Sequence, residues 1–314
     1  MIEIRNLVKY YGEKLAVNDI SFSVEKGEIL GFLGPNGAGK STTMNILTGY
    51  LSATSGTVTI NGHDILEDPH KAKSCIGYLP ENPPLYLDMT VLEYLKFVSD
   101  LKGVPTADRI QGLARIMKMV RITDVSERLI KNLSKGYRQR VGIAQAMIGN
   151  PDVLVLDEPT VGLDPKQIIE IRNLIKELGK QHTVILSSHI LPEVQAVCER
   201  VVIIDQGRIA AIDTPDGLSR KMAKSSSFQL AAEGPADKIV NVLKSISGVN
   251  RAEIVLEKEN NITLFEIENA PELDVRKQVF FAMAENRWPI IEIKSLDPTL
   301  EDIFLKVTGS GSGI

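Results

Sequence analysis

The sequence lacks long apolar runs and any excess of positive charge. No 18 consecutive apolar residues occur, and the apolar stretch 141–156 is interrupted by Asn150 and Asp152, so we expect no membrane-spanning helix. Lys and Arg number 36 against 40 Asp and Glu, which gives a net charge of -4. The overall charge therefore gives no reason to expect nucleic acid as a partner.

Cysteine is also scarce. Cys75 and Cys198 are far apart in the sequence and form no metal or redox spacing, so we expect buried, reduced thiols and a cytosolic compartment. The apolar fraction of 43% and the charged fraction of 24% are typical of a globular protein. A chain of 314 residues has room for two domains of about 100–200 residues each.

Residues 1–215 alternate short β-branched runs with helical patterns, which predicts an α/β domain with a largely parallel sheet. Short, continuous apolar runs predict buried strands at 28–33, 152–157, 183–188 and 200–205. The alternating stretch GTVTING (56–62) ends in Asn61-Gly62, which predicts a hairpin. We therefore expect a mixed sheet, with antiparallel strands added to a parallel core.

The pattern changes between Met89 and Arg128. VLEYLKFVSDL and IQGLARIMKMV have apolar residues at helical spacing, and no strand is visible between them. This pattern predicts a helical subdomain at about 86–145, in which the Met and aromatic side chains pack a core.

A second change follows the core domain. The Ser-rich end of 216–226 predicts a linker. The order strand, helix, strand, strand, helix, strand then predicts a small α+β domain of the ferredoxin-like kind at 227–308, closed by a helix in PTLEDIFLKVT. Residues 309–314 read GSGSGI and predict a flexible tail. Phe280, Phe281 and Trp288 are expected to pack the core of this domain.

The motif GPNGAGKS (34–41) lies between the predicted strand 28–33 and the helical pattern TTMNILTGY, which is the context of a P-loop. Glycines allow the backbone to wrap closely, so that successive N–H groups face phosphate oxygens. The expected nucleotide-binding residues are Gly34, Asn36, Gly37, Ala38, Gly39, Lys40, Ser41 and Thr42. Lys40 is expected at the β- and γ-phosphates and Ser41 at Mg²⁺, so the predicted ligand is a nucleoside triphosphate with magnesium.

The stretch DVLVLDEP supplies the carboxylates that such a site requires. Asp157 ends an apolar strand, as expected for a residue that holds Mg²⁺, and Glu158 follows it directly. A carboxylate next to the metal ligand is well placed to activate an attacking water. The sequence therefore predicts hydrolysis, with Glu158 as general base.

Five further motifs occur in a fixed order: KYYG with Tyr11, IGYLPE at 76–81, LSKGYRQR at 133–140, VGLDP at 161–165 and LSSHI with His189. Together with the P-loop they span residues 1–215 and resemble the ATP-binding subunit of ABC transporters. The closing SLDPTLEDIFLKVT resembles the ABC-2-like group, similar to sodium-efflux, drug-resistance and gliding-type ATPases. The resemblance implies a P-loop ABC ATPase fold that binds ATP and Mg²⁺.

The resemblance also implies roles for individual residues. Tyr11 would stack on adenine, His189 would contact the γ-phosphate, and Asp164 would belong to the D-loop. In the family, the signature of one subunit closes over the ATP of the other, which implies a role in trans for Ser134, Lys135 and Gly136.

Two positions depart from the family pattern. Glu81 stands where most members have glutamine, and we expect it to bind Mg²⁺ directly or through water and to sense the membrane subunit. Lys135 adds a cation to the signature. Two interpretations stay open for it: support for closure over ATP through a charge-assisted contact, or an orientation toward solvent.

By resemblance, the expected partners are a second ATPase subunit, as homodimer or heterodimer, and separately encoded membrane permease subunits, with this chain on the cytoplasmic face. Export is the expected direction. A soluble ABC ATPase acting on nucleic acid or ribosomes is the alternative, although one P-loop and no sustained heptad run argue against it. A non-catalytic regulatory subunit is disfavoured because Lys40, Asp157, Glu158 and His189 are all present.

Overall fold

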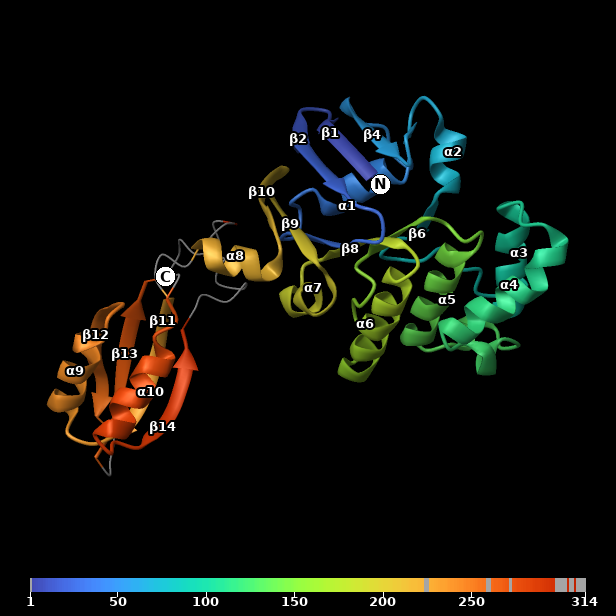
Figure 1. Cartoon of the computed structure of the whole chain (residues 1–314). Helices are drawn as coiled ribbons and strands as arrows, with labels where there is room; N and C mark the ends of the chain where they lie inside the picture. The colour runs from blue at the N-terminus through green and yellow to red at the C-terminus, as the bar shows by residue number, and fades with distance from the viewer. Residues whose placement is uncertain are drawn as a thin grey trace. The chain divides into compact units, whose positions relative to one another are not determined.

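The structure is a computed structural model that describes residues 2–222, 226–257, 261–270, 273–296, 304 and 308. The chain divides into two compact units (Figure 1). The first holds residues 2–215 and Thr308, and the second holds the described residues of 216–305. No helix in the described residues has both the length and the apolar character needed to cross a membrane.

A six-stranded sheet forms the centre of the first unit, in the order β10-β9-β3-β8-β7-β6. Every neighbouring pair is parallel except β9 and β10. The strands are β3 (Ile29–Leu33), β6 (Ile76–Leu79), β7 (Val153–Asp157), β8 (Thr183–Ser188), β9 (Arg200–Asp205) and β10 (Arg208–Asp213). The predicted parallel core is confirmed; β6 and β10 were not predicted.

A second, antiparallel sheet has the order β2-β1-β4-β5. Its strands are β1 (Ile2–Tyr11), β2 (Lys14–Val24), β4 (Ser55–Ile60) and β5 (His63–Asp64). The predicted hairpin is confirmed, because Ile60 pairs with His63 and the two turn residues, Asn61 and Gly62, have φ of 51° and 82°, as a type I′ turn requires.

Helix α1 (Lys40–Leu47) packs with both sheets of this unit. Its residue Met44 is fully buried in one cluster with Ile4 of β1 and Leu30 of β3. Burial of one face of α1 against two sheets fixes the helix, and with it the position of the loop that precedes it. Helix α2 (Pro69–Ser74) follows β5 of the antiparallel sheet and precedes β6 of the six-stranded sheet in the sequence.

The predicted helical subdomain contains α3 (Val91–Leu101), α4 (Thr106–Met119), two short 3-10 turns (Thr123–Val125 and Ile130–Asn132) and α5 (Lys135–Met147). These three α-helices gather at one end of the first unit (Figure 1). A capping box begins α3, because Thr90 and Glu93 exchange side-chain and backbone hydrogen bonds. Two more helices, α6 (Pro165–Gly179) and α7 (Leu191–Val197), follow strands of the core sheet.

The second unit has the strand order β12-β13-β11-β14, with all neighbours antiparallel. Its elements are β11 (Ser226–Glu233), α9 (Ala236–Ser245), β12 (Val249–Glu257), β13 (Ile262–Asn269), α10 (Arg276–Glu285) and β14 (Ile290–Ser295). Both helices pack on one face of the sheet (Figure 1). The element order and this strand order are those of a ferredoxin-like unit.

Three sequence expectations for this part of the chain need comment. Phe280 and Phe281 do not pack the core, since they are 54% and 53% exposed. Val279 and Met283, one turn apart, form the buried face of α10, so a helix cannot direct the two phenylalanines between them inward as well. Trp288 packs partly buried against the core, as expected.

Helix α8 (Pro215–Met222) overlaps the predicted linker 216–226. Pro215 at the first helical position and an acid in the first turn are typical of a helix start, and the sequence prediction overlooked them. Most of the predicted final helix and all of the tail at 309–314 lie outside the described residues.

Candidate active site

The loop 34–39 joins the end of β3 to the start of α1. A Cβ atom at Gly34 would collide with the carbonyl oxygen of Ile204. Gly37 and Gly39 have φ of 81° and 108°, a left-handed conformation that favours glycine. Both a close approach and an unusual backbone conformation therefore require the glycines of this loop, which ends at the N-terminus of α1.

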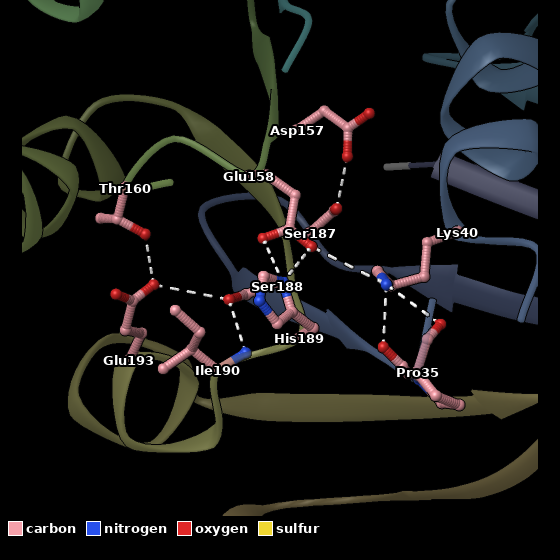
Figure 2. A network of polar contacts seen from close by, with 11 residues as sticks. Pro35, Lys40, Asp157, Glu158, Thr160, Ser187, Ser188, His189, Ile190 and Glu193 are labelled. Atoms are coloured by element: carbon pink, nitrogen blue, oxygen red, sulfur yellow. Dashed lines mark hydrogen bonds and ion pairs between the residues drawn. The ribbon is translucent and has the colours of Figure 1, made fainter. Parts of the chain in front are cut away.

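Lys40 is the first residue of α1, and its side chain is only 6% exposed. Its amine donates hydrogen bonds to the carbonyl oxygens of Gly34 (2.8 Å) and Pro35 (3.3 Å), and lies 3.7 Å from Glu158 Oε1 (Figure 2). Burial lowers the pKa of Lys40, and the carboxyls of Glu158 and Asp157 oppose that shift. The loop thus holds a cation beside the two carboxyls.

Those carboxyls lie at the carboxyl end of β7. The Ser187 hydroxyl donates a hydrogen bond of 2.5 Å to Asp157. Burial raises the pKa of Asp157, whereas the hydroxyl groups of Ser187 and Ser41 lower it. Glu158 has φ of 49°, which is uncommon for a residue with a side chain, so the chain turns sharply directly after β7.

His189 faces Glu158 from the end of β8. Its Nδ1 lies 2.9 Å from both carboxyl oxygens of Glu158 (Figure 2). The Glu158 side chain is 7% exposed, whereas that of His189 is 41% exposed. The imidazole therefore stands at the open side of the pair, where it can meet a ligand.

A cleft of about 970 Å³ runs past these groups. Ten of the predicted residues line it: Tyr11, Asn36, Gly37, Gly39, Lys40, Ser41, Thr42, Glu81, Glu158 and His189. Gly34 and Ala38 belong to the loop but do not line the cleft, and neither does Asp157. Tyr11 is 48% exposed, and Lys9 Nζ lies 5.5 Å from the centre of its ring.

Six cleft residues were missed by the sequence prediction: Lys14, Leu15, Ala16, Val161, Gln206 and Gly207. Three begin β2, and two form the turn between β9 and β10. Gly207 donates a backbone hydrogen bond of 2.9 Å to the Ala38 carbonyl, which explains why this turn lies beside the phosphate-binding loop. The only sequence signal was the Gln-Gly pair after a predicted strand.

The residues predicted at Mg²⁺ provide oxygen atoms close to one another. The Ser41 side chain lowers the pKa of Asp157, and the charge of Glu81 acts on both Asp157 and Lys40. In the described part of the chain, no group of three or more His, Cys, Asp or Glu side chains could hold a metal ion by itself. Mg²⁺ in nucleotide sites is commonly held by one or two carboxylates together with waters and phosphates, so this set of oxygen donors fits it.

The signature residues lie outside the cleft. Ser134 is the N-cap of α5 and accepts a hydrogen bond from the Tyr137 N–H. Gly136 is buried, and a Cβ atom there would meet the Gln167 side chain of α6 at 2.6 Å. Asp164 caps α6 by accepting a hydrogen bond of 2.9 Å from the Gln167 N–H.

Lys135 is exposed, but its amine lies over Gly162, where any Cβ atom would collide with it. Neither orientation considered from the sequence included this contact. Arg140, about one turn after Gly136 in α5, forms an ion pair of 2.6 Å with Glu170 of α6. Helix α5 is thus joined to the segment 161–170 at three successive points: Lys135, Gly136 and Arg140.

Comparisons with known proteins agree with this geometry. Residues 17–161 match the family model described as ABC transporter. The chain is 34% identical to the linearmycin resistance ATP-binding protein LnrL of Bacillus subtilis, over 98% of both chains. It is 31% identical to the bacitracin transport ATP-binding protein BcrA of Bacillus licheniformis, over 99% of this chain and 98% of the relative.

Solved structures show the same likeness. The dimeric structure of MJ0796, a bacterial ABC transporter cassette, is 27% identical and has a TM-score of 0.62, covering 68% of this chain and 98% of that one. The same cassette in a post-hydrolysis state bound to ADP and phosphate is 26% identical, with a TM-score of 0.62 and the same coverage. The chain belongs to the family of ABC transporter ATP-binding proteins and is an ATPase of that family.

Proposed function

We propose that this chain works as one of two ATPase subunits that bind two ATP molecules between them and drive separately encoded membrane subunits, in the direction of export. One observation carries the proposal: the cleft holds the phosphate-binding loop, Glu158 and His189, whereas Ser134 and Gly136 lie outside it. A second copy, or a related chain, would bring its own signature to the open side of the cleft. The dimeric MJ0796 cassette supports this arrangement.

Within the site, the N–H groups of residues 36–42 would hold the phosphates at the start of α1. Lys40 would pair with the β- and γ-phosphates, and Tyr11 would stack on the adenine. Ser41, Asp157 and Glu81 would hold Mg²⁺, which, when bound, offsets the charge of the phosphates. Asp164, as the cap of α6, would keep the D-loop in position beside the second subunit.

Hydrolysis would depend on Glu158 and His189. A water molecule beside the γ-phosphate would give its proton to the Glu158 carboxylate as its oxygen attacks the γ-phosphorus. The bond from that phosphorus to the oxygen bridging to the β-phosphate would break at the same time, so that ADP leaves and inorganic phosphate forms. His189 lies 2.9 Å from that carboxylate and is open to the cleft, so it would both orient the base and contact the γ-phosphate.

Export rests on the relatives, since LnrL is named for linearmycin resistance and BcrA for bacitracin transport. The experiment is to express the chain with a membrane protein encoded by a neighbouring gene and to follow both through membrane flotation. We expect the chain to float with the membrane only when that partner is present. Failure to float with any such partner, while ATP is still hydrolysed, would favour the soluble alternative acting on nucleic acid or ribosomes.

Glu81→Gln is expected to raise the Mg²⁺ concentration needed for half-maximal ATP hydrolysis by about 10-fold. The reason is that an amide is a weaker ligand than a carboxylate and adds no negative charge beside Asp157. The measurement is a Mg²⁺ titration of phosphate release, with the exposed residue Glu67 changed to Gln as control. If Glu81→Gln abolished hydrolysis and Glu158→Gln retained it, Glu81 and not Glu158 would be the general base.

Lys135→Gly is expected to weaken ATP-driven dimerisation by about 10-fold at low salt, since one charge-assisted contact contributes about 1.5–3 kcal/mol. Lys135→Gln keeps most of the length of the side chain and separates the effect of charge from that of backbone freedom. The dimer Kd is measured with ATP and Mg²⁺ by sedimentation at low and high salt. If the Kd is unchanged in both, Lys135 makes no contact with the partner's nucleotide.

A further inference from the structure

A buried acid lies behind the proposed catalytic pair. Glu193, in the first turn of α7, is 3% exposed. Its Oε2 accepts hydrogen bonds from the hydroxyl groups of Thr160 and Ser188, the second at 3.4 Å (Figure 2). We call these three residues the Glu193 cluster. None of them lines the ATP cleft.

The partners of Glu193 belong to the two segments that carry the reacting side chains. Thr160 follows Glu158 by two residues, and Ser188 directly precedes His189. The Ser188 hydroxyl also accepts a hydrogen bond of 3.0 Å from the Ile190 N–H, so this segment is held on both sides of His189. One carboxyl group therefore ties the turn after β7 to the turn after β8.

This carboxyl is unfavourable where it lies. Its other oxygen, Oε1, is buried and has no hydrogen-bond partner among the described residues, and a buried polar atom without a partner costs free energy. The neighbouring buried positions of α7 are Leu191, Val194 and Val197, so an apolar side chain would suit the packing. A costly acid at this position points to a need for its hydrogen bonds.

We propose that Glu193 is a positioning residue for ATP hydrolysis, which keeps the Glu158 and His189 segments at the separation that gives their 2.9 Å contact. The inference rests on the proposed roles of these two residues. Proton transfer to a base depends steeply on its position, because a displacement of about 1 Å can cost about 100-fold in rate. Loss of the cluster would let the two turns move independently, while the residues that bind ATP keep their places.

The test compares kcat and KM for ATP in Glu193→Ala, Thr160→Val and Glu193→Gln. We expect kcat to fall about 100-fold in Glu193→Ala and about 10-fold in Thr160→Val, with KM changed less than about twofold. Glu193→Gln keeps an oxygen acceptor and is expected to recover most of the loss. The matched control is Thr183→Val. Thr183 is as buried as Thr160, at 3%, and its hydroxyl oxygen accepts a hydrogen bond from the Gly27 N–H, away from the cleft.

A second readout separates positioning from a general structural role. In a Glu158→Gln background, Glu193→Ala is expected to cause no further loss of rate, because both changes act through the same base. An equal loss in both backgrounds, a loss confined to KM, or an unchanged kcat in Thr160→Val would each overturn the proposal. Should Glu193→Ala fail to fold, Thr160→Val decides, since it keeps the shape of the side chain.

The outcome for Glu193 can be told apart from the proposed function. If Glu158→Gln hydrolyses ATP at nearly the rate of the unaltered protein, the assignment of the base fails, whatever the cluster does. If Glu158→Gln is inactive and Thr160→Val is unaffected, the base assignment stands and the role of Glu193 is excluded.

Discussion

Glu158→Gln is expected to lower kcat for ATP hydrolysis by about 10²–10⁴-fold while ATP still binds. The amide keeps the shape of the side chain, beside Lys40 at 3.7 Å and His189 at 2.9 Å, but cannot accept the proton of an attacking water. Phosphate release gives kcat, and titration calorimetry gives the Kd for ATP with Mg²⁺.

The control for Glu158→Gln is Glu28→Gln. Glu28 is also buried, at 9%, and pairs with Arg200 on the core sheet, away from the cleft. We expect that control to keep its kcat. A Glu158→Gln protein that hydrolyses ATP within a factor of about 10 of the unaltered protein would contradict a role as general base.

Lys40→Met is expected to raise the Kd for ATP by about 100-fold, equivalent to about 2.7 kcal/mol, because hydrogen bonds to charged groups contribute about 1.5–3 kcal/mol each. Methionine keeps much of the length but has no donor for the phosphates. The buried position of Lys40, held by carbonyl oxygens of its own loop, means that the amine is already in place before ATP arrives.

Thermal unfolding with and without ATP measures the loss of ATP affinity in Lys40→Met. A ligand at 100 times its Kd stabilises a protein by about 2.7 kcal/mol, so the unaltered protein should show a clear rise in Tm and Lys40→Met almost none. Lys180→Met, at an exposed lysine that pairs with Glu177, is the control. An equal rise in Tm for Lys40→Met would exclude Lys40 from phosphate binding.

The phosphate-binding loop was predictable because its chemistry lies in eight consecutive residues. Gly34 is required by the close approach of Ile204. Gly37 and Gly39 are required instead by the local backbone, as their φ values confirm, so a sequence can specify them without tertiary contacts. The same holds for the buried parallel strands, which are short and continuously apolar. Strands β1 and β2 mix charged and apolar residues and carry several register shifts, which disturbs the alternating pattern.

The far wall of the cleft could not be predicted in the same way. Gln206 and Gly207 reach the site only because β9 packs beside β3 and their turn meets the phosphate-binding loop. The contact between Lys135 and Gly162 likewise joins two segments through tertiary packing alone. The two exposed phenylalanines of α10 show a limit of composition: both count as apolar, but helical geometry decides whether either of them faces the core.

The three links between α5 and the segment 161–170 have a genetic consequence in the proposed dimer. The start of α5 would belong to one ATP site, and the turn around Gly162 follows the base of the other. A side chain introduced at Gly162 must displace Lys135. In a homodimer, a single codon change would place this substitution in both subunits, and each subunit would then disturb both ATP sites. Substitutions here should therefore be far rarer among functional variants than substitutions at an equally exposed loop elsewhere.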